Sequence, residues 1–222
     1  MTEAEVYRQI KPLLEGDTEG LYWDFKKTLH DNQIPDIIKD ILAFSNSSYQ
    51  GDSYIIVGVS EPTTQKGTQK ISLNQSDRLR LDTDAKYLYL PGKWNIQGLS
   101  AHDIGKVKEF SAKISDEISS CMLISQPECE FVPVQIKTKR WLFVIIIKNK
   151  PGVFISKKDI SAPYDDKKII VKQGVLYVRI ADTTIGAKTE AAMATEYIRT
   201  WKRYLEWLES SPENSRISEE SI

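Results

Sequence analysis

One run of apolar residues constrains the fold of this chain more than any other feature. It extends from Tyr54 to Val59 and reads Tyr-Ile-Ile-Val-Gly-Val, with no alternation of polar residues. Continuous apolar runs of this length are typical of strands covered on both faces. Gly58 within the run permits a close approach of another backbone segment. The run therefore predicts a central strand that other elements cover on both sides.

Segments with helical periodicity lie before and after this strand in the sequence. Thr2 and Glu5 have the spacing of a capping box at the start of the first apolar stripe. Pro35 suits the first turn of the next helix. The predicted helices are 2–15, 35–48, 104–123 and 188–209.

The remaining patterned segments predict strands. Besides the Tyr54 run, these are 20–27, 130–136, 141–148 and 169–180. Together the elements predict one α+β domain over 1–190, with a mixed β-sheet flanked by helices. A C-terminal helix (191–210) and a disordered tail (211–222) follow, and 62–103 is a long polar excursion from the core.

Composition excludes several classes of protein. No apolar run approaches the roughly 20 residues of a membrane span. The first residues are acidic, whereas a secretory signal begins with basic residues, so we expect a cytoplasmic protein. Cys121 and Cys129 form no CxxC pair, which argues against a thiolate zinc site. His30 and His102 are too far apart in sequence to indicate a histidine-based centre.

The segment from Glu19 to Lys26 combines a strand pattern with charge. Leu21, Trp23 and Phe25 alternate with more polar residues, so one face of this strand enters a core. The other face presents Asp24 and Lys26 side by side, and Glu19 lies just before the strand. Two carboxylates and an ammonium on one face suit a metal-assisted phosphodiester site, but they equally suit an ordinary solvated face.

Positive charge is concentrated late in the chain although the net charge is −1. Between Lys137 and Arg179 there are eleven Lys and Arg residues and three Asp residues. Such asymmetry points to a phosphate-binding face, or alternatively to lysines that keep strand edges soluble. The candidate nucleic-acid contacts are Lys139, Arg140, Lys167, Lys168, Lys172 and Arg179.

Four short motifs in this order resemble the Schlafen-type AlbA domain, over roughly residues 15–190. The first is an acidic residue followed after four positions by Asp-Phe-Lys, and the second is a helix ending Ala-Phe-x-Asn. The third is a strand with Gly-Val and a following acid, and the last is Tyr-x-Arg. The matching residues are Glu19, Asp24-Phe25-Lys26, Ala43-Phe44-Ser45-Asn46, Gly51 to Glu61, and Tyr177-Val178-Arg179.

The resemblance implies nucleic-acid binding, and for the nucleolytic Schlafen proteins it implies cleavage of tRNA-like RNA. Three carboxylates serve a divalent-metal site in those enzymes, and they correspond here to Glu19, Asp24 and Glu61. Mg²⁺ or Mn²⁺ is the expected cofactor because both prefer hard oxygen ligands. Lys26 would steady the phosphate or orient water. Schlafen enzymes enclose RNA between two related lobes, so this single lobe would act as a homodimer.

This chain departs from the family pattern at two carboxylates. Asp24 stands where Glu is usual, and Glu61 stands where Asp is usual, so each side chain changes reach by one methylene. A non-catalytic DNA- or RNA-binding regulator therefore remains an alternative. A protein-interaction domain that uses the aromatic last helix is another. Relatives are often labelled ATP-binding, but the chain has no Gly-Lys-Ser/Thr phosphate loop. Arg179 could also form an internal ion pair, for example with Asp182.

Overall fold

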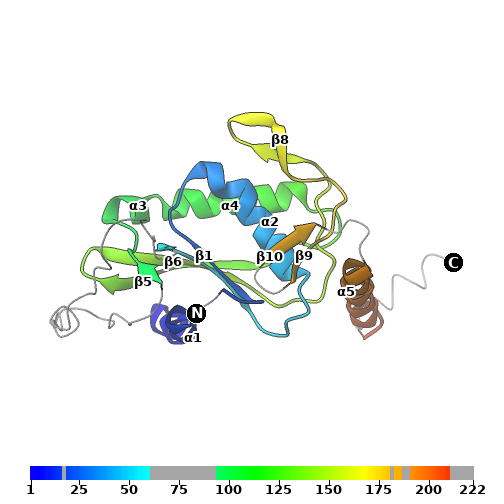
Figure 1. The fold of residues 1–222 in the computed structure, drawn as a ribbon, viewed down its shortest axis with the longest axis horizontal. Helices are drawn as coiled ribbons and strands as arrows, with labels where there is room; N and C mark the ends of the chain where they lie inside the picture. Colours follow the sequence, from blue (N-terminus) through cyan, green and yellow to red (C-terminus); the bar gives the residue numbers. More distant parts are fainter. Residues whose placement is uncertain (17–18, 61–93, 181–182, 187–190, 211–222) are drawn as a thin grey trace, which may run out of the picture.

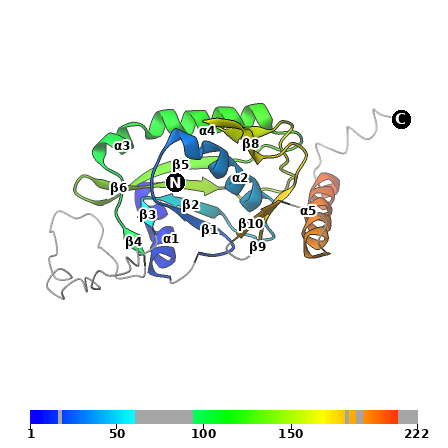
Figure 2. The same ribbon diagram turned by 45° about the horizontal axis from the view of Figure 1, so that its top comes forward.

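A mixed four-stranded sheet organises the protein (Figures 1 and 2). The computed structural model describes residues 1–16, 19–60, 94–180, 183–186 and 191–210. The strand order is β1 (Trp23–Lys26), β2 (Ser53–Val57), β6 (Arg140–Ile147) and β5 (Cys129–Lys137). β1 runs parallel to β2, and the other neighbours are antiparallel. The predicted α+β fold with a mixed sheet is confirmed.

Helices cover both faces of this sheet, as Figure 1 shows. α1 (Glu3–Glu15) lies below it, and its Thr2–Glu5 capping box is formed. α2 (Ile34–Ser45) and α4 (Val107–Cys121) lie above it. All five residues of β2 are buried: Tyr54 and Ile56 pack against α1, and Ile55 and Val57 pack against α2 on the opposite face. The apolar run thus has the two-sided cover that its composition predicts.

Two predicted elements are divided in the structure. The helix expected over 104–123 is split at Lys106 into α3 (Ala101–Gly105) and α4. The strand expected over 169–180 is interrupted by a turn at Gly174, whose φ of 69° is readily adopted only by glycine. It yields β8 (Asp165–Val171), which pairs with β7 (Ile160–Ala162), and β9 (Tyr177–Ile180), which pairs with β10 (Thr183–Gly186).

Most of the 62–103 excursion lies outside the described residues, as does the 211–222 tail. At the end of the excursion, β4 (Asn95–Ile96) pairs with β3 (Val59–Ser60). A 3₁₀ turn, η1 (Asp31–Gln33), precedes α2. No helix in the described part of the chain is long and apolar enough to span a membrane.

The last helix, α5 (Ala191–Ser210), packs at one end of the molecule beside β9 (Figure 1). Trp201 and Tyr204 contact a small apolar cluster that includes Ile155 and Val178. These two aromatic residues therefore pack against the rest of the domain.

Asn46 joins the end of α2 to three other segments. Its side chain is buried, and it donates to the carbonyls of Phe154 (2.9 Å) and Tyr177 (3.0 Å) and accepts from the Phe154 amide (3.0 Å). Its own carbonyl accepts from Thr200 on α5. The asparagine of the Ala-Phe-x-Asn motif therefore has a structural role here.

Asn46→Ala is expected to lower the free energy of unfolding by about 2 kcal/mol, because it leaves three buried backbone groups without partners. Urea unfolding followed by circular dichroism measures this. Asn149→Ala is the matched control, since that exposed amide donates a single hydrogen bond to the Gln50 carbonyl. A loss no larger than that of the control would contradict the role assigned to Asn46.

Candidate active site

The alternation of β1 places its charged residues on one side of the sheet. Phe25 is buried against α1 on one face of the sheet, whereas Asp24 and Lys26 lie on the other face, toward α2 and the β9–β10 hairpin. The predicted juxtaposition of Asp24 and Lys26 is correct. Their face is not solvated, however, because α2 and β9 cover it and leave Asp24 only 6% exposed.

Asp24 is held by two cations. The Lys26 Nζ lies 2.6 Å from its Oδ2, and the Arg179 Nη2 lies 3.2 Å from its Oδ1. Buried carboxylates require such partners, because desolvation of an unpaired charge costs several kcal/mol. Both oxygens of Asp24 are therefore engaged within the protein.

Asp40, on α2, is a third carboxylate at this position. The Lys26 Nζ lies 2.8 Å from Asp40 Oδ2, and the Thr184 hydroxyl donates to Asp40 Oδ1 at 2.9 Å. Burial, together with the charge of Asp24, raises the pKa of Asp40. Asp40 is not among the residues that the sequence motifs singled out. The available signal was its place on the inward stripe of a helix, between Ile37 and Ile41, where an acid must have a buried partner.

Glu19 completes the arrangement from the loop before β1. Its Oε1 accepts a hydrogen bond from the Phe25 amide at 2.8 Å. Burial and the negative charge of Asp24 raise the pKa of Glu19 to about 7, against the opposing effects of Arg179 and Lys26. A carboxyl group that titrates near neutral pH can take up and release protons under ordinary conditions.

We call these five residues the charged cluster: Glu19, Asp24, Lys26, Asp40 and Arg179. Burial opposes the charge of the Lys26 ammonium, but Asp40 and Asp24 together raise its pKa above the ordinary value. Three carboxylates thus share two cations, which leaves one excess negative charge. Burial is the main cause of the raised pKa values of Glu19 and Asp40, and the negative charge of Asp24 adds to it.

Arg179 belongs to the interior of the protein. Its side chain is 2% exposed, donates to the Trp23 carbonyl (3.2 Å) and lies over the Phe44 ring at 4.8 Å. The internal ion pair that the sequence left open is present, and its partner is Asp24. In this conformation Arg179 offers no exposed contact to a phosphate.

The other predicted nucleic-acid contacts are exposed but separated. Lys139 and Arg140 lie at the β5–β6 turn, while Lys168 and Lys172 lie on or just after β8. Figures 1 and 2 show these two hairpins on different parts of the molecule, with the β5–β6 turn at one end and β8 near α2 and α4. The side chain of Lys167 lies outside what the structure describes. The structure therefore does not gather these positions into one patch.

The charged cluster suits a divalent cation only in part. Glu19 and Asp24 supply the hard oxygen atoms that Mg²⁺ and Mn²⁺ prefer, and the excess negative charge favours a cation. The third expected ligand, Glu61, lies outside the described residues. Among the residues that the structure describes, no group of three or more Asp, Glu, His or Cys side chains is arranged to hold a metal ion.

Residues 19–87 match the family model described as Schlafen, AlbA_2. The match covers about a third of the chain and includes Glu19, Asp24, Lys26 and Glu61. It confirms the resemblance drawn from the motifs, and this family suggests nucleic-acid binding.

Among solved structures, the chain is similar to the N-terminal domain of a RecG-related protein from Nitrosomonas europaea. The two share 12% identity with a TM-score of 0.44, over 86% of this chain and 93% of the other. A search of curated proteins found no match.

Proposed function

We propose that this chain, which carries a Schlafen AlbA_2 segment, binds nucleic acid and cleaves structured RNA such as tRNA in a metal-dependent reaction. The charged cluster is the proposed centre. Glu19, Asp24 and Glu61 would hold Mg²⁺ or Mn²⁺, and Lys26 would contact the phosphate. Two copies of the chain would enclose the RNA between them.

The excess negative charge of the cluster is the observation that carries this proposal. Three buried or half-buried carboxylates face two cations. Burial, together with the negative charge of Asp24, raises the pKa of Glu19 to about 7. Such an arrangement is unfavourable for stability unless a cation or a proton compensates the charge. Strongly perturbed acids of this kind are concentrated at functional sites.

Each residue has a distinct part in the proposed reaction. A bound Mg²⁺ or Mn²⁺ would stabilise charge on the scissile phosphate and acidify water. Glu19 would bind the metal as a carboxylate, and metal binding would displace the proton that it holds up to about pH 7. Lys26 is positioned by Asp24 and Asp40, so its ammonium is fixed before the substrate arrives. Arg179 would neutralise Asp24 without touching the substrate.

One observation favours a second candidate, a non-catalytic nucleic-acid-binding module. Both oxygens of Asp24 already have cationic partners, so Asp24 would have to exchange one of them to bind a metal. A site whose ion pairs are complete can be a stable structural element without catalysis.

Incubation of the purified protein with total tRNA, and separately with single-stranded DNA, distinguishes these candidates. We expect cutting of tRNA at low salt with Mg²⁺ or Mn²⁺, no cutting with chelator, and a gel shift in every condition. A gel shift without cutting in either metal would support the binding module. The absence of any shift at low salt would contradict nucleic-acid binding itself.

A further inference from the structure

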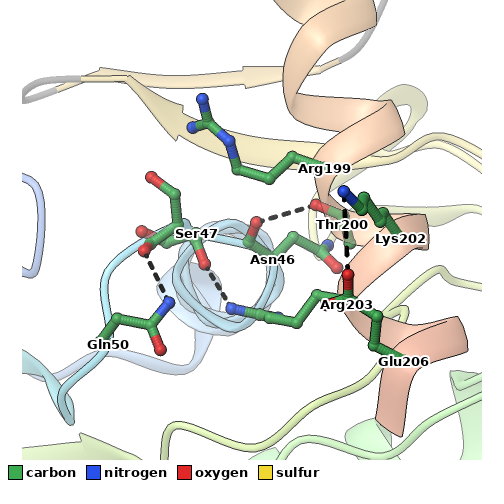
Figure 3. Close-up of a pocket in the computed structure, with 9 residues that line it drawn as sticks. Asn46, Ser47, Gln50, Arg199, Thr200, Lys202, Arg203 and Glu206 are labelled. Atoms are coloured by element: carbon green, nitrogen blue, oxygen red, sulfur yellow. Dashed lines mark hydrogen bonds and ion pairs between the residues drawn. The ribbon is translucent and has the colours of Figure 1, made fainter. Parts of the chain in front are cut away.

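A pocket of about 250 Å³ lies between the end of α2 and α5 (Figure 3). Ser47, Ser48 and Gln50 line it from the loop after α2, while Arg199, Lys202 and Arg203 line it from α5. The three basic residues are spaced three and four positions apart, so they lie on one side of the helix. The pocket therefore combines hydroxyl and amide groups with three cations.

Arg203 is a half-buried cation, and no acidic partner for it lies among the described residues. Its guanidinium donates to the carbonyls of Ser47 (2.9 Å) and Ser45 (3.2 Å). In the described part of the chain, no carboxylate lies within 4.0 Å of it, and burial lowers the pKa of Arg203. Because buried charges are normally paired, an anion in the pocket would supply the missing counter-charge.

The remaining charges in the pocket also favour an anion. Glu206 is the acid that lines it, and its carboxylate lies 3.8 Å from the Lys202 ammonium. Both side chains are more than 60% exposed, so this pair contributes little. Arg203 covers the last carbonyls of α2, which would otherwise repel an anion at the negative end of the helix.

The pocket and the charged cluster lie along the same helix. Asp40 belongs to the cluster, and the pocket begins just after Ser45, the last residue of α2. A helical rise of 1.5 Å per residue puts Asp40 and Ser45 roughly 8 Å apart along the helix axis. A strand whose scissile phosphate reached the cluster could therefore place a nearby phosphate of the same strand at the pocket.

We propose that the α2–α5 pocket binds a backbone phosphate of a nucleic acid that lies across the charged cluster. Guanidinium groups bind phosphate through paired hydrogen bonds, and an ammonium adds a point charge. The inference rests on nucleic-acid binding as proposed above. It does not require cleavage.

Salt dependence of binding tests this inference. The variant is Arg199→Gln/Lys202→Gln, which changes two exposed side chains and leaves Arg203 in place. The matched control is Arg8→Gln/Lys11→Gln, an exposed pair at the same spacing on α1. Affinity for a short RNA duplex is measured over a range of salt concentrations. Circular dichroism checks that both variants remain folded.

We expect the pocket variant to lose about tenfold in affinity at low salt and to reduce the slope of log K against log salt by about one. The control is expected to keep the wild-type slope. If the wild-type protein binds and the slope of the pocket variant is unchanged, the proposal for the pocket is overturned and nucleic-acid binding by the protein is not. Failure of the wild-type protein to bind would overturn both proposals.

Titration with inorganic phosphate tests whether the pocket binds a backbone phosphate or a free phosphate ion. Calorimetric titration with phosphate is expected to show only weak binding, which the pocket variant abolishes. Tight binding of free phosphate, combined with an RNA affinity that phosphate does not reduce, would assign the pocket to a small anion and overturn the inference.

Discussion

Glu19→Gln is expected to abolish metal-dependent RNA cleavage and to make the folded protein more stable above pH 7. The amide keeps an oxygen that can accept from the Phe25 N–H, but it can neither take up a proton nor carry charge to a metal. Removal of a metal ligand or general base typically costs at least 10²-fold in rate. We therefore expect a loss of 10²-fold or more in single-turnover cleavage.

The gain in stability follows from the pKa of Glu19. The folded protein keeps the proton up to about pH 7, whereas the unfolded chain releases it near the ordinary value of 4.5. Stability of the wild-type protein therefore falls as pH rises from about 4.5 to 7, and the penalty stays constant above. A shift of this size corresponds to about 3 kcal/mol. Since Glu19 is only half-buried, we expect a gain of about 1–2 kcal/mol for the variant.

Urea unfolding at pH 4 and pH 8, in chelator, measures this difference. The two proteins should have similar stability at pH 4 and should differ at pH 8. Glu15→Gln is the matched control, because Glu15 is exposed at the end of α1. It should leave cleavage and stability unchanged.

Full cleavage by the Glu19 variant would show that Glu19 has no part in the proposed reaction. Equal stability of the two proteins at pH 8 would show that folding does not raise the pKa of Glu19.

Arg179→Met is expected to lower the free energy of unfolding by about 3–4 kcal/mol. The change removes one of two cations from Asp24 and raises the excess of negative charge in the cluster. Breaking a buried ion pair from one side commonly costs 3–5 kcal/mol. Lys26 remains beside Asp24, which keeps the expected loss at the lower end. Thermal and urea unfolding at pH 7 measure it.

Lys172→Met is the control for this change, because Lys172 is an exposed basic residue close to the same hairpin. We expect it to alter stability by less than about 0.5 kcal/mol. If Arg179→Met instead kept full stability and lost RNA binding, Arg179 would be a phosphate contact rather than an interior partner of Asp24.

Patterns within a few residues of one another made much of this fold predictable. The apolar run at Tyr54, the capping box at Thr2 and Pro35 in the first turn of α2 each specify a local structure without reference to distant segments. The alternation along β1 likewise showed that Asp24 and Lys26 share a face. The splits at Lys106 and Gly174 were missed because a periodic pattern continues through a short turn.

Burial of the charged face could not be predicted in the same way. Whether Asp24 is solvated depends on α2 and β9, which are distant in sequence, and no local pattern shows where they pack. Asp40 was overlooked for that reason. The number of basic residues between Lys137 and Arg179 likewise does not show where they lie in the fold. Arg179 is buried in the interior, while Lys139 and Lys168 lie on separate hairpins.

The pairing of Asp24 with Arg179 has a consequence for synthesis of the chain. The two residues are 155 positions apart, so a ribosome adding 5–20 residues per second makes Arg179 about 8 to 30 s after Asp24. During that interval Lys26 is the cation available to Asp24, and Lys26 also forms an ion pair with Asp40. The buried charges of β1 therefore have their full set of partners only after β9 has been made. The segment that carries the family match, 19–87, does not contain Arg179, so it lacks one of the two cations that hold Asp24.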